Sequence, residues 1–134
     1  MFKKTTLLIL IVMFLNISQI AISAETRSPR LDNAFSTNED FSITPNGLSE
    51  IYAVYTAYDN NFSSARITIE LQKRNLLVFW KDITSWEITS TQDYYITERT
   101  YQVDNGTYRV NITYEFFNTD GTSEVIERTI KCTY

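Results

Sequence analysis

The stretch Asp104-Asn105-Gly106-Thr107-Tyr108-Arg109-Val110-Asn111-Ile112-Thr113-Tyr114-Glu115-Phe116-Phe117, followed by Asn118-Thr119-Asp120-Gly121, decides the fold of this chain. It reads as a turn, a strand and a second turn. Apolar and polar side chains alternate along the middle part, which is the two-residue period of a strand with one buried face. The apolar set is Tyr108, Val110, Ile112, Tyr114 and Phe116. A second sheet must cover that face, so the stretch predicts a layered β fold.

The remainder of the chain has the same β character. Residues 48–58 place Ile51, Ala53, Tyr55 and Ala57 on the side that we expect to face inward, and residues 65–72 alternate without an exception. Further strand patterns cover residues 35–44, 76–80, 89–101 and 123–134, with a bend expected at residues 73–75. No window has the spacing of three and four that an amphipathic helix needs. We therefore predict an all-β fold, a two-sheet antiparallel sandwich of about seven strands.

The first 33 residues are predicted to lie outside the folded domain. Lys3 and Lys4 precede an apolar run over residues 7–15, and Ala24 closes the segment, so residues 1–24 resemble a secretory signal peptide. The run is too short for a membrane-spanning helix, which needs about 20 apolar residues. Residues 25–33 are predicted to be a flexible leader and residues 34–134 a single β-sandwich domain. We expect a secreted, extracellular protein with no stable membrane insertion after signal cleavage, and an uncleaved signal anchor is the alternative.

Composition argues against several functional classes. The chain has 12 basic and 16 acidic residues, and removal of Lys3 and Lys4 with the signal leaves 10 basic ones. No basic cluster is visible along the sequence, so we expect no nucleic acid partner and a basic rather than an acidic charged partner. The sequence contains no histidine, the commonest general base and metal ligand. We therefore expect a protein that is not an enzyme and has neither cofactor nor metal.

Aspartate and cysteine are two further residue types that could carry chemistry. The aspartates Asp82, Asp93, Asp104 and Asp120 lack the spacing of a calcium loop and are expected to be solvated turn residues. Cys132 is the only cysteine and shares parity with Ile126 and Ile130, so we expect a buried thiol on the last strand. An intermolecular disulfide and a reactive thiol are the alternatives, although a reactive thiol would lack a histidine as its base.

The pattern Asp104-x-Gly106-x-Tyr108 resembles the tyrosine corner of immunoglobulin-like sandwiches. In that motif the tyrosine hydroxyl bonds to the backbone upstream and fixes the connection between strands of opposite sheets. The resemblance implies an immunoglobulin-like or fibronectin type III-like fold. It departs from the immunoglobulin pattern at Val110, where that family has a cysteine, and this departure favours a fibronectin type III-like relative.

The same resemblance implies positions elsewhere in the domain. Ile67 or Ile69 would stand where the immunoglobulin family places its core tryptophan, and Gln102 and Asp104 replace the leucine and proline usual in fibronectin type III modules. The chain is also similar to small secreted proteins of Gram-positive bacteria that have no assigned function. The residues that carry this likeness are Leu71-Gln72-Lys73, Trp80, Trp86 and the last hairpin. That second likeness implies export and a β-sandwich but no activity.

Aromatic residues supply the candidate ligand contact. Phe79, Trp80 and Trp86, with Tyr94 and Tyr95, could form a platform for a sugar or a peptide, or they could close the core. Two hypotheses follow for a monomeric protein: a binding or adhesion module for an unknown protein or glycan ligand, and a structural or envelope-associated protein without a specific soluble ligand. An enzyme is the third hypothesis.

Overall fold

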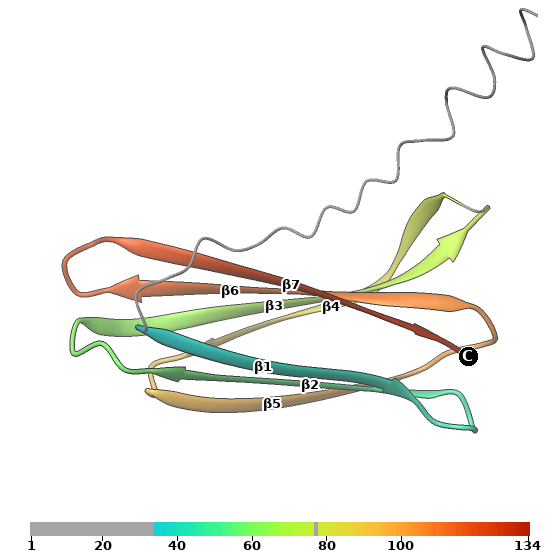
Figure 1. Ribbon diagram of the computed structural model, residues 1–134, viewed down its shortest axis with the longest axis horizontal. Coiled ribbons are helices and arrows are strands. Elements are labelled where there is room, and N and C mark those ends of the chain that lie inside the picture. The colour runs from blue at the N-terminus through green and yellow to red at the C-terminus, as the bar shows by residue number, and fades with distance from the viewer. Residues whose placement is uncertain (1–33, 77) are drawn as a thin grey trace, which may run out of the picture.

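A computed structural model describes residues 34–76 and 78–134, and over these residues the chain is entirely β. Seven strands follow one another and are labelled in Figure 1. They are β1 (Phe35–Ile43), β2 (Leu48–Ala57), β3 (Phe62–Asn75), β4 (Phe79–Ser90), β5 (Tyr94–Gln102), β6 (Thr107–Asn118) and β7 (Ser123–Thr133). Residues 1–24 and 25–33, predicted to be signal peptide and leader, lie outside the described residues.

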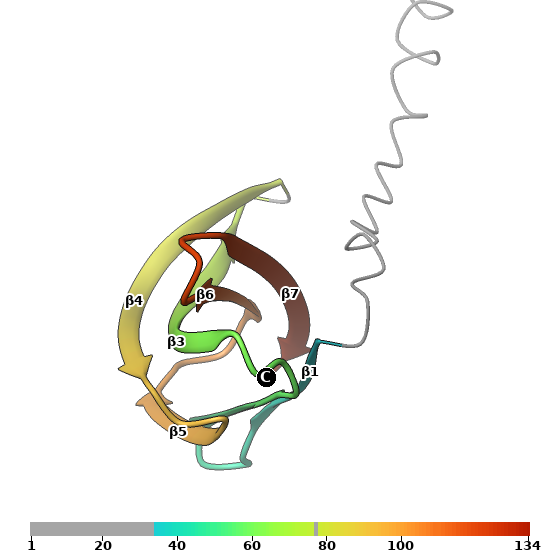
Figure 2. The same ribbon diagram turned by 90° about the vertical axis from the view of Figure 1, so that its left-hand side faces the viewer.

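The strands form two antiparallel sheets that pack face to face. One sheet has the order β1-β2-β5 and the other the order β4-β3-β6-β7. Figure 2 views the two layers along the strands and shows β1 beside β7 on one flank. On that flank, Arg128 Nε of β7 lies 3.8 Å from Glu39 Oε2 of β1. The predicted all-β, two-sheet antiparallel sandwich of about seven strands is therefore confirmed.

The core consists of the side chains that the alternation placed inward. In β6 every second residue from Tyr108 to Phe116 is buried, and the inward sets of β2 and of residues 65–71 are buried as expected. Part of this core is aromatic, because Phe35 stacks on Phe116 with ring centroids 4.1 Å apart and Tyr55 meets the edge of the same ring. Period-two alternation therefore decided which side of each strand faces the other sheet.

Strand boundaries differ from the sequence prediction in two regions. The bend expected at residues 73–75 is absent, because β3 continues to Asn75 and pairs Arg74 with Trp80 and Asn75 with Phe79. The strand expected over residues 76–80 begins only at Phe79. The expected strand over residues 89–101 is divided, because β4 ends at Ser90 and β5 begins at Tyr94 in the other sheet. The Tyr55 hydroxyl donates to Gln92 O at 2.7 Å and holds this crossing. Continuous β-prone sequence concealed a change of sheet.

Cys132 lies on the last strand as expected but is only half-buried, so the prediction of a buried thiol is wrong. Its side chain packs against the core together with that of Ile130, whereas Ile126 is fully buried on the same strand. The cause is position, since β7 is an edge strand that pairs only with β6. Within residues 34–76 and 78–134, no helix is both long and apolar enough to span a membrane.

Candidate functional site

The β3–β4 hairpin extends beyond the body of the sandwich and carries the most exposed apolar side chains of the described chain. Figure 1 shows it rising away from the two sheets beside the end of β7. Leu76 is 80% exposed, Val78 74% and Phe79 70%. We call these three residues the hairpin tip. Large apolar side chains gathered at a protruding tip, with no described part of the chain covering them, are typical of a contact surface.

The backbone of the hairpin tip is ordered by short-range bonds. The Val78 N–H donates to the carbonyl of Leu76 at 2.6 Å, directly beyond the last cross-strand pair of Asn75 and Phe79. Leu76 has a φ of 44°, in the left-handed region that favours glycine or asparagine. Leucine there costs about 1 to 2 kcal/mol relative to an unstrained backbone. Its side chain is exposed, so no described core contact offsets that cost.

Trp80 lies one step behind the hairpin tip on the outer face of the larger sheet. The Arg109 guanidinium stacks over its ring with Cζ 4.4 Å from the centroid, and Lys131 Nζ lies 5.9 Å from the same centroid. Arg109 Nε also donates to Gln72 Oε1 at 2.6 Å, which fixes the guanidinium in place. Trp80 is therefore a half-buried, cation-lined side chain rather than part of the core.

Trp86 has a different environment. It is half-buried opposite Ile69 on β4, packs against the core, and meets the edge of Tyr101 with ring centroids 6.5 Å apart. Tyr94 and Tyr95 begin β5 at the far end of the sandwich from the hairpin. The structure therefore does not gather the five aromatic residues into one platform. Phe79 and Trp80 belong to the hairpin, and Trp86 belongs to the rim of the core.

Basic side chains surround the stem of the hairpin. Residues 34–134 contain eight basic residues, and five of them lie on the stem or on the strands beside Trp80. They are Lys73, Arg74, Lys81, Arg109 and Lys131, which we call the basic collar. Carboxylates also lie among them: Asp104 bonds Lys73 at 2.7 Å, and Asp82 accepts from Gln72 at 2.6 Å. No basic cluster is visible along the sequence, but the folded chain has one, because β6 and β7 bring Arg109 and Lys131 to the hairpin stem.

The residues of the predicted tyrosine corner lie together at the start of β6. Tyr108 is 1% exposed, and its hydroxyl lies 2.7 Å from Asp104 O and 2.6 Å from Asp104 Oδ1, either of which can accept its proton. Lys73 and the Tyr108 hydroxyl lower the pKa of Asp104 to about 2, since both stabilise the carboxylate. Burial and the same carboxylate raise the pKa of Tyr108. Asp104, Gly106 and Tyr108 thus lie at the connection that joins the two sheets.

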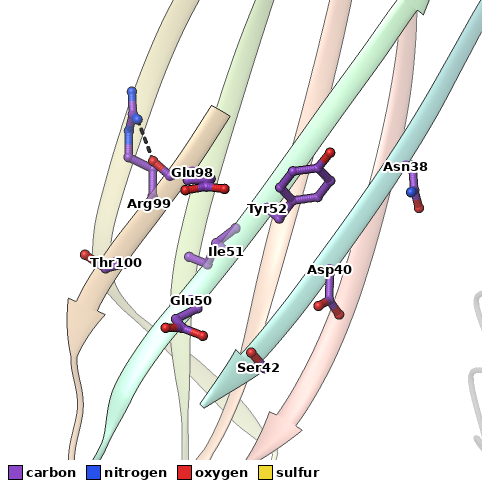
Figure 3. Close-up of a pocket in the computed structure, with 9 residues that line it drawn as sticks. All are labelled: Asn38, Asp40, Ser42, Glu50, Ile51, Tyr52, Glu98, Arg99 and Thr100. Atoms are coloured by element: carbon purple, nitrogen blue, oxygen red, sulfur yellow. Dashed lines mark hydrogen bonds between the residues drawn. The ribbon is translucent and has the colours of Figure 1, made fainter. Parts of the chain in front are cut away.

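The outer face of the smaller sheet has a shallow acidic depression of about 520 Å³ that sequence reasoning missed. Figure 3 shows its lining, in which Tyr52 of β2 stands between Asp40 of β1 and Glu98 of β5. Glu50 lies in the next row, beside Ser42 and Thr100. The outward parity of each residue was readable, but the register that aligns them was not. Among the described residues, no group of three metal-ligating side chains is close enough to hold a metal ion.

Comparison with known proteins adds no family to this description. No protein-family model matches the chain, and no curated protein is similar to it at a significant level. The two-sheet arrangement is compatible with an immunoglobulin-like or fibronectin type III-like fold.

Proposed function

We propose that this chain is a secreted, non-catalytic binding or adhesion module that contacts its ligand through the β3–β4 hairpin. The observation that carries the proposal is the hairpin tip, where Leu76, Val78 and Phe79 project from a rigid sandwich with most of their surface exposed. Loops and turns held by a packed scaffold commonly carry binding function. Phe79 and Trp80, two of the three residues that the sequence singled out, lie at or beside this tip.

The scaffold is proposed to be of the fibronectin type III-like kind. In constant-type immunoglobulin domains the fourth strand joins the sheet of the first, second and fifth strands. Here β4 pairs with β3 instead, so the sheet of β1, β2 and β5 has three strands and the sheet of β3, β4, β6 and β7 has four. The valine at position 110, in place of a cysteine, agrees with this choice.

A non-catalytic role is supported by the chemistry of the sequence. Histidine is absent, and the single cysteine lies on an edge strand away from any paired base among the described residues. The three carboxylates of the acidic depression line an open surface on the outer face of the smaller sheet. No cofactor is proposed.

Export and partners complete the proposal. The charged start, apolar run and Ala24 support cleavage of residues 1–24 and release of a monomeric extracellular protein, like the small secreted proteins of Gram-positive bacteria that the sequence resembles. Its ligand would belong to an envelope or a host surface, with protein and glycan as the classes expected from sequence. The structural, envelope-associated protein without a soluble ligand is the alternative.

The test is retention of the exported protein on envelope fractions, glycan arrays and host extracts. Phe79→Ser should lower retention about tenfold, because it removes one largely exposed aromatic contact. The matched control is Val125→Ser on β7, where Val125 is 46% exposed and lies at the other end of the sandwich. Equal loss in both variants, or no retention of the wild type by any material, would contradict the proposal.

Trp86→Ala serves as a second control for folding. Because Trp86 packs on the core rim, this variant should unfold at lower denaturant concentration and should be scored for stability before binding.

A further inference from the structure

We propose that the ligand of the hairpin is the surface of an anionic lipid bilayer, with the hairpin tip inserted among the lipid headgroups and the basic collar against them. This inference rests on the proposed function, because it names the ligand that the hairpin contacts. It describes peripheral docking of a folded protein and not a membrane-spanning segment.

The order of side chains along the hairpin matches the layers of a bilayer surface. Leu76, Val78 and Phe79 come first and are apolar and exposed. Trp80 follows one position behind, and tryptophan is enriched at the membrane–water interface, where its ring meets headgroups. The basic collar lies behind the tip, with Lys81 and Arg74 on the stem and Arg109 and Lys131 against Trp80. Apolar, aromatic and cationic side chains thus succeed one another with distance from the tip.

Charge complementarity selects an anionic surface despite the net negative charge of the domain. Residues 34–134 carry fourteen acidic and eight basic side chains, and five of the basic ones lie in the collar together with Asp82 and Asp104. Asp40, Glu50 and Glu98 lie on the outer face of the smaller sheet, which is the other layer of the sandwich. Charges beyond about 10 Å are largely screened at physiological salt, so the surface near the lipid governs docking. Each basic residue close to an anionic leaflet strengthens binding.

Backbone geometry at the tip also suits an interface of low water content. Strand pairing continues to Asn75 and Phe79, and the Val78 N–H is satisfied by Leu76 O. Paired backbone groups lower the cost of entering an apolar environment. Leu76 has a φ of 44°, a backbone conformation in which asparagine or glycine would be less strained. A strained backbone that carries an exposed leucine is expected where the apolar side chain has a role outside the folded core.

The experiment measures binding of the exported protein to vesicles of phosphatidylcholine with about 30% phosphatidylglycerol, and to vesicles of phosphatidylcholine alone. Cosedimentation gives the partition coefficient, and a blue shift of tryptophan fluorescence in a Trp86→Phe background reports on Trp80. Binding should be at least roughly tenfold stronger to the anionic vesicles and should fall as salt is raised. All variants carry the same N-terminal segment ahead of residue 34, so any contribution of that segment cancels in the comparison.

Three substitutions and one control separate the contributions of the hairpin tip and the basic collar. Phe79→Ser should weaken vesicle binding about tenfold by removing an inserted side chain. Lys81→Glu, which reverses one charge of the collar, should weaken binding to anionic vesicles roughly 30-fold and leave binding to neutral vesicles unchanged. Leu76→Asn should weaken binding while the protein remains folded, and Val125→Ser should change nothing.

Several outcomes would overturn the inference. Equal binding to both vesicle types, or equal binding of Phe79→Ser and the wild type, would exclude docking by the hairpin tip. A soluble polyanion such as dextran sulfate that binds as well as vesicles would show that charge alone acts. Hairpin-dependent self-association in sedimentation, or hairpin-dependent retention by a glycan or protein with no vesicle binding, would replace the lipid by that partner. In the last case the proposed function survives, whereas absence of retention by every material removes both.

Discussion

Two regions turn the chain at the same end of the sandwich, and they differ in their hydrogen bonds and in the exposure of their side chains. One is the corner region, which consists of the β1–β2 turn at residues 44–47, the β5–β6 connection at residues 103–106, and Tyr134. The other is the hairpin tip. In the corner region Val103 N–H donates to Gly47 O at 2.7 Å, and the Tyr134 hydroxyl donates to Pro45 O at 3.0 Å. Among its described residues, the hairpin tip has the bond from Val78 N–H to Leu76 O and three exposed apolar side chains.

Each region has a residue with positive φ, and the two residues explain the contrast. Gly47 has a φ of 77°, and an added Cβ would meet Val103 O at 2.5 Å, so only glycine fits. Leu76 has a φ of 44° at the tip, and its side chain is 80% exposed. The β1–β2 turn at Gly47 therefore has a residue that its backbone conformation favours. The hairpin tip accepts backbone strain and keeps an apolar surface, which is the pattern expected of a binding element.

The largest effect is expected from Gly47→Ala. A Cβ would combine left-handed strain with a backbone clash against Val103 O, so the free energy of unfolding should fall by about 2 to 4 kcal/mol. Denaturant melts measure it. Gly121→Ala is the matched control, because Gly121 has a φ of 85° with nothing within 4 Å of its added Cβ, and it should cost only about 1 kcal/mol. Equal losses of unfolding free energy in the two variants would show that the clash between the added Cβ and Val103 O contributes nothing.

Tyr108→Phe should have the next largest effect. It removes the hydroxyl that bonds Asp104 while retaining the buried ring, so the unfolding free energy should fall by about 1 kcal/mol. Chemical denaturation of both forms at neutral pH gives the difference. Identical midpoints and slopes would mean that the corner depends on the ring and not on the hydroxyl.

At the hairpin tip, Leu76→Asn should act in the opposite direction. Asparagine tolerates the left-handed region, so the unfolding free energy should stay constant or rise by about 0.5 to 1 kcal/mol. Thermal and chemical melts test the sign. A clear loss of stability would show that the Leu76 side chain contributes to the fold, and the contrast between the two regions would then fail.

The smallest effect is a pH dependence in the corner region. The pKa of Asp104 lies at about 2 in the folded protein and near 3.8 ordinarily, so its stabilising effect is present above about pH 4 and is lost as pH falls through 2. Asp104→Asn should therefore flatten the stability profile between these pH values. Because the carboxylate is exposed, added salt should shrink the difference. Parallel profiles for both forms would contradict the assignment.

Sequence reasoning succeeded where structure depends on near neighbours. The inward sets of β2, β3 and β6 were readable, and so was the proximity of Tyr108 to Asp104 four positions away. It was less successful at the ends of strands. The division between β4 and β5 was hidden, because residues 89–101 are β-prone throughout while the chain changes sheets at Thr91–Asp93.

The candidate site was only partly readable for the same reason. Phe79 and Trp80 stood out as aromatic residues, but the length of the hairpin depends on pairing of β3 with β4 beyond the sandwich. The bulge between Leu71 and Gln72 shifts that pairing by one residue, and nothing in the local pattern marks it. The acidic depression likewise needs Asp40, Tyr52 and Glu98 in one register row.

The sequence by itself determined the all-β class, the buried side of each regular strand, the glycine turns and the absence of histidine chemistry, because these follow from residue type and a period of two. Only the tertiary structure decided which strands share a sheet, that Trp86 joins the core rim while Trp80 meets Arg109 and Lys131, and that an acidic domain has a basic collar. The physical reason is that sheet order and register are pairings between distant segments. They are selected by burial of both sheet faces together, and not by any local preference.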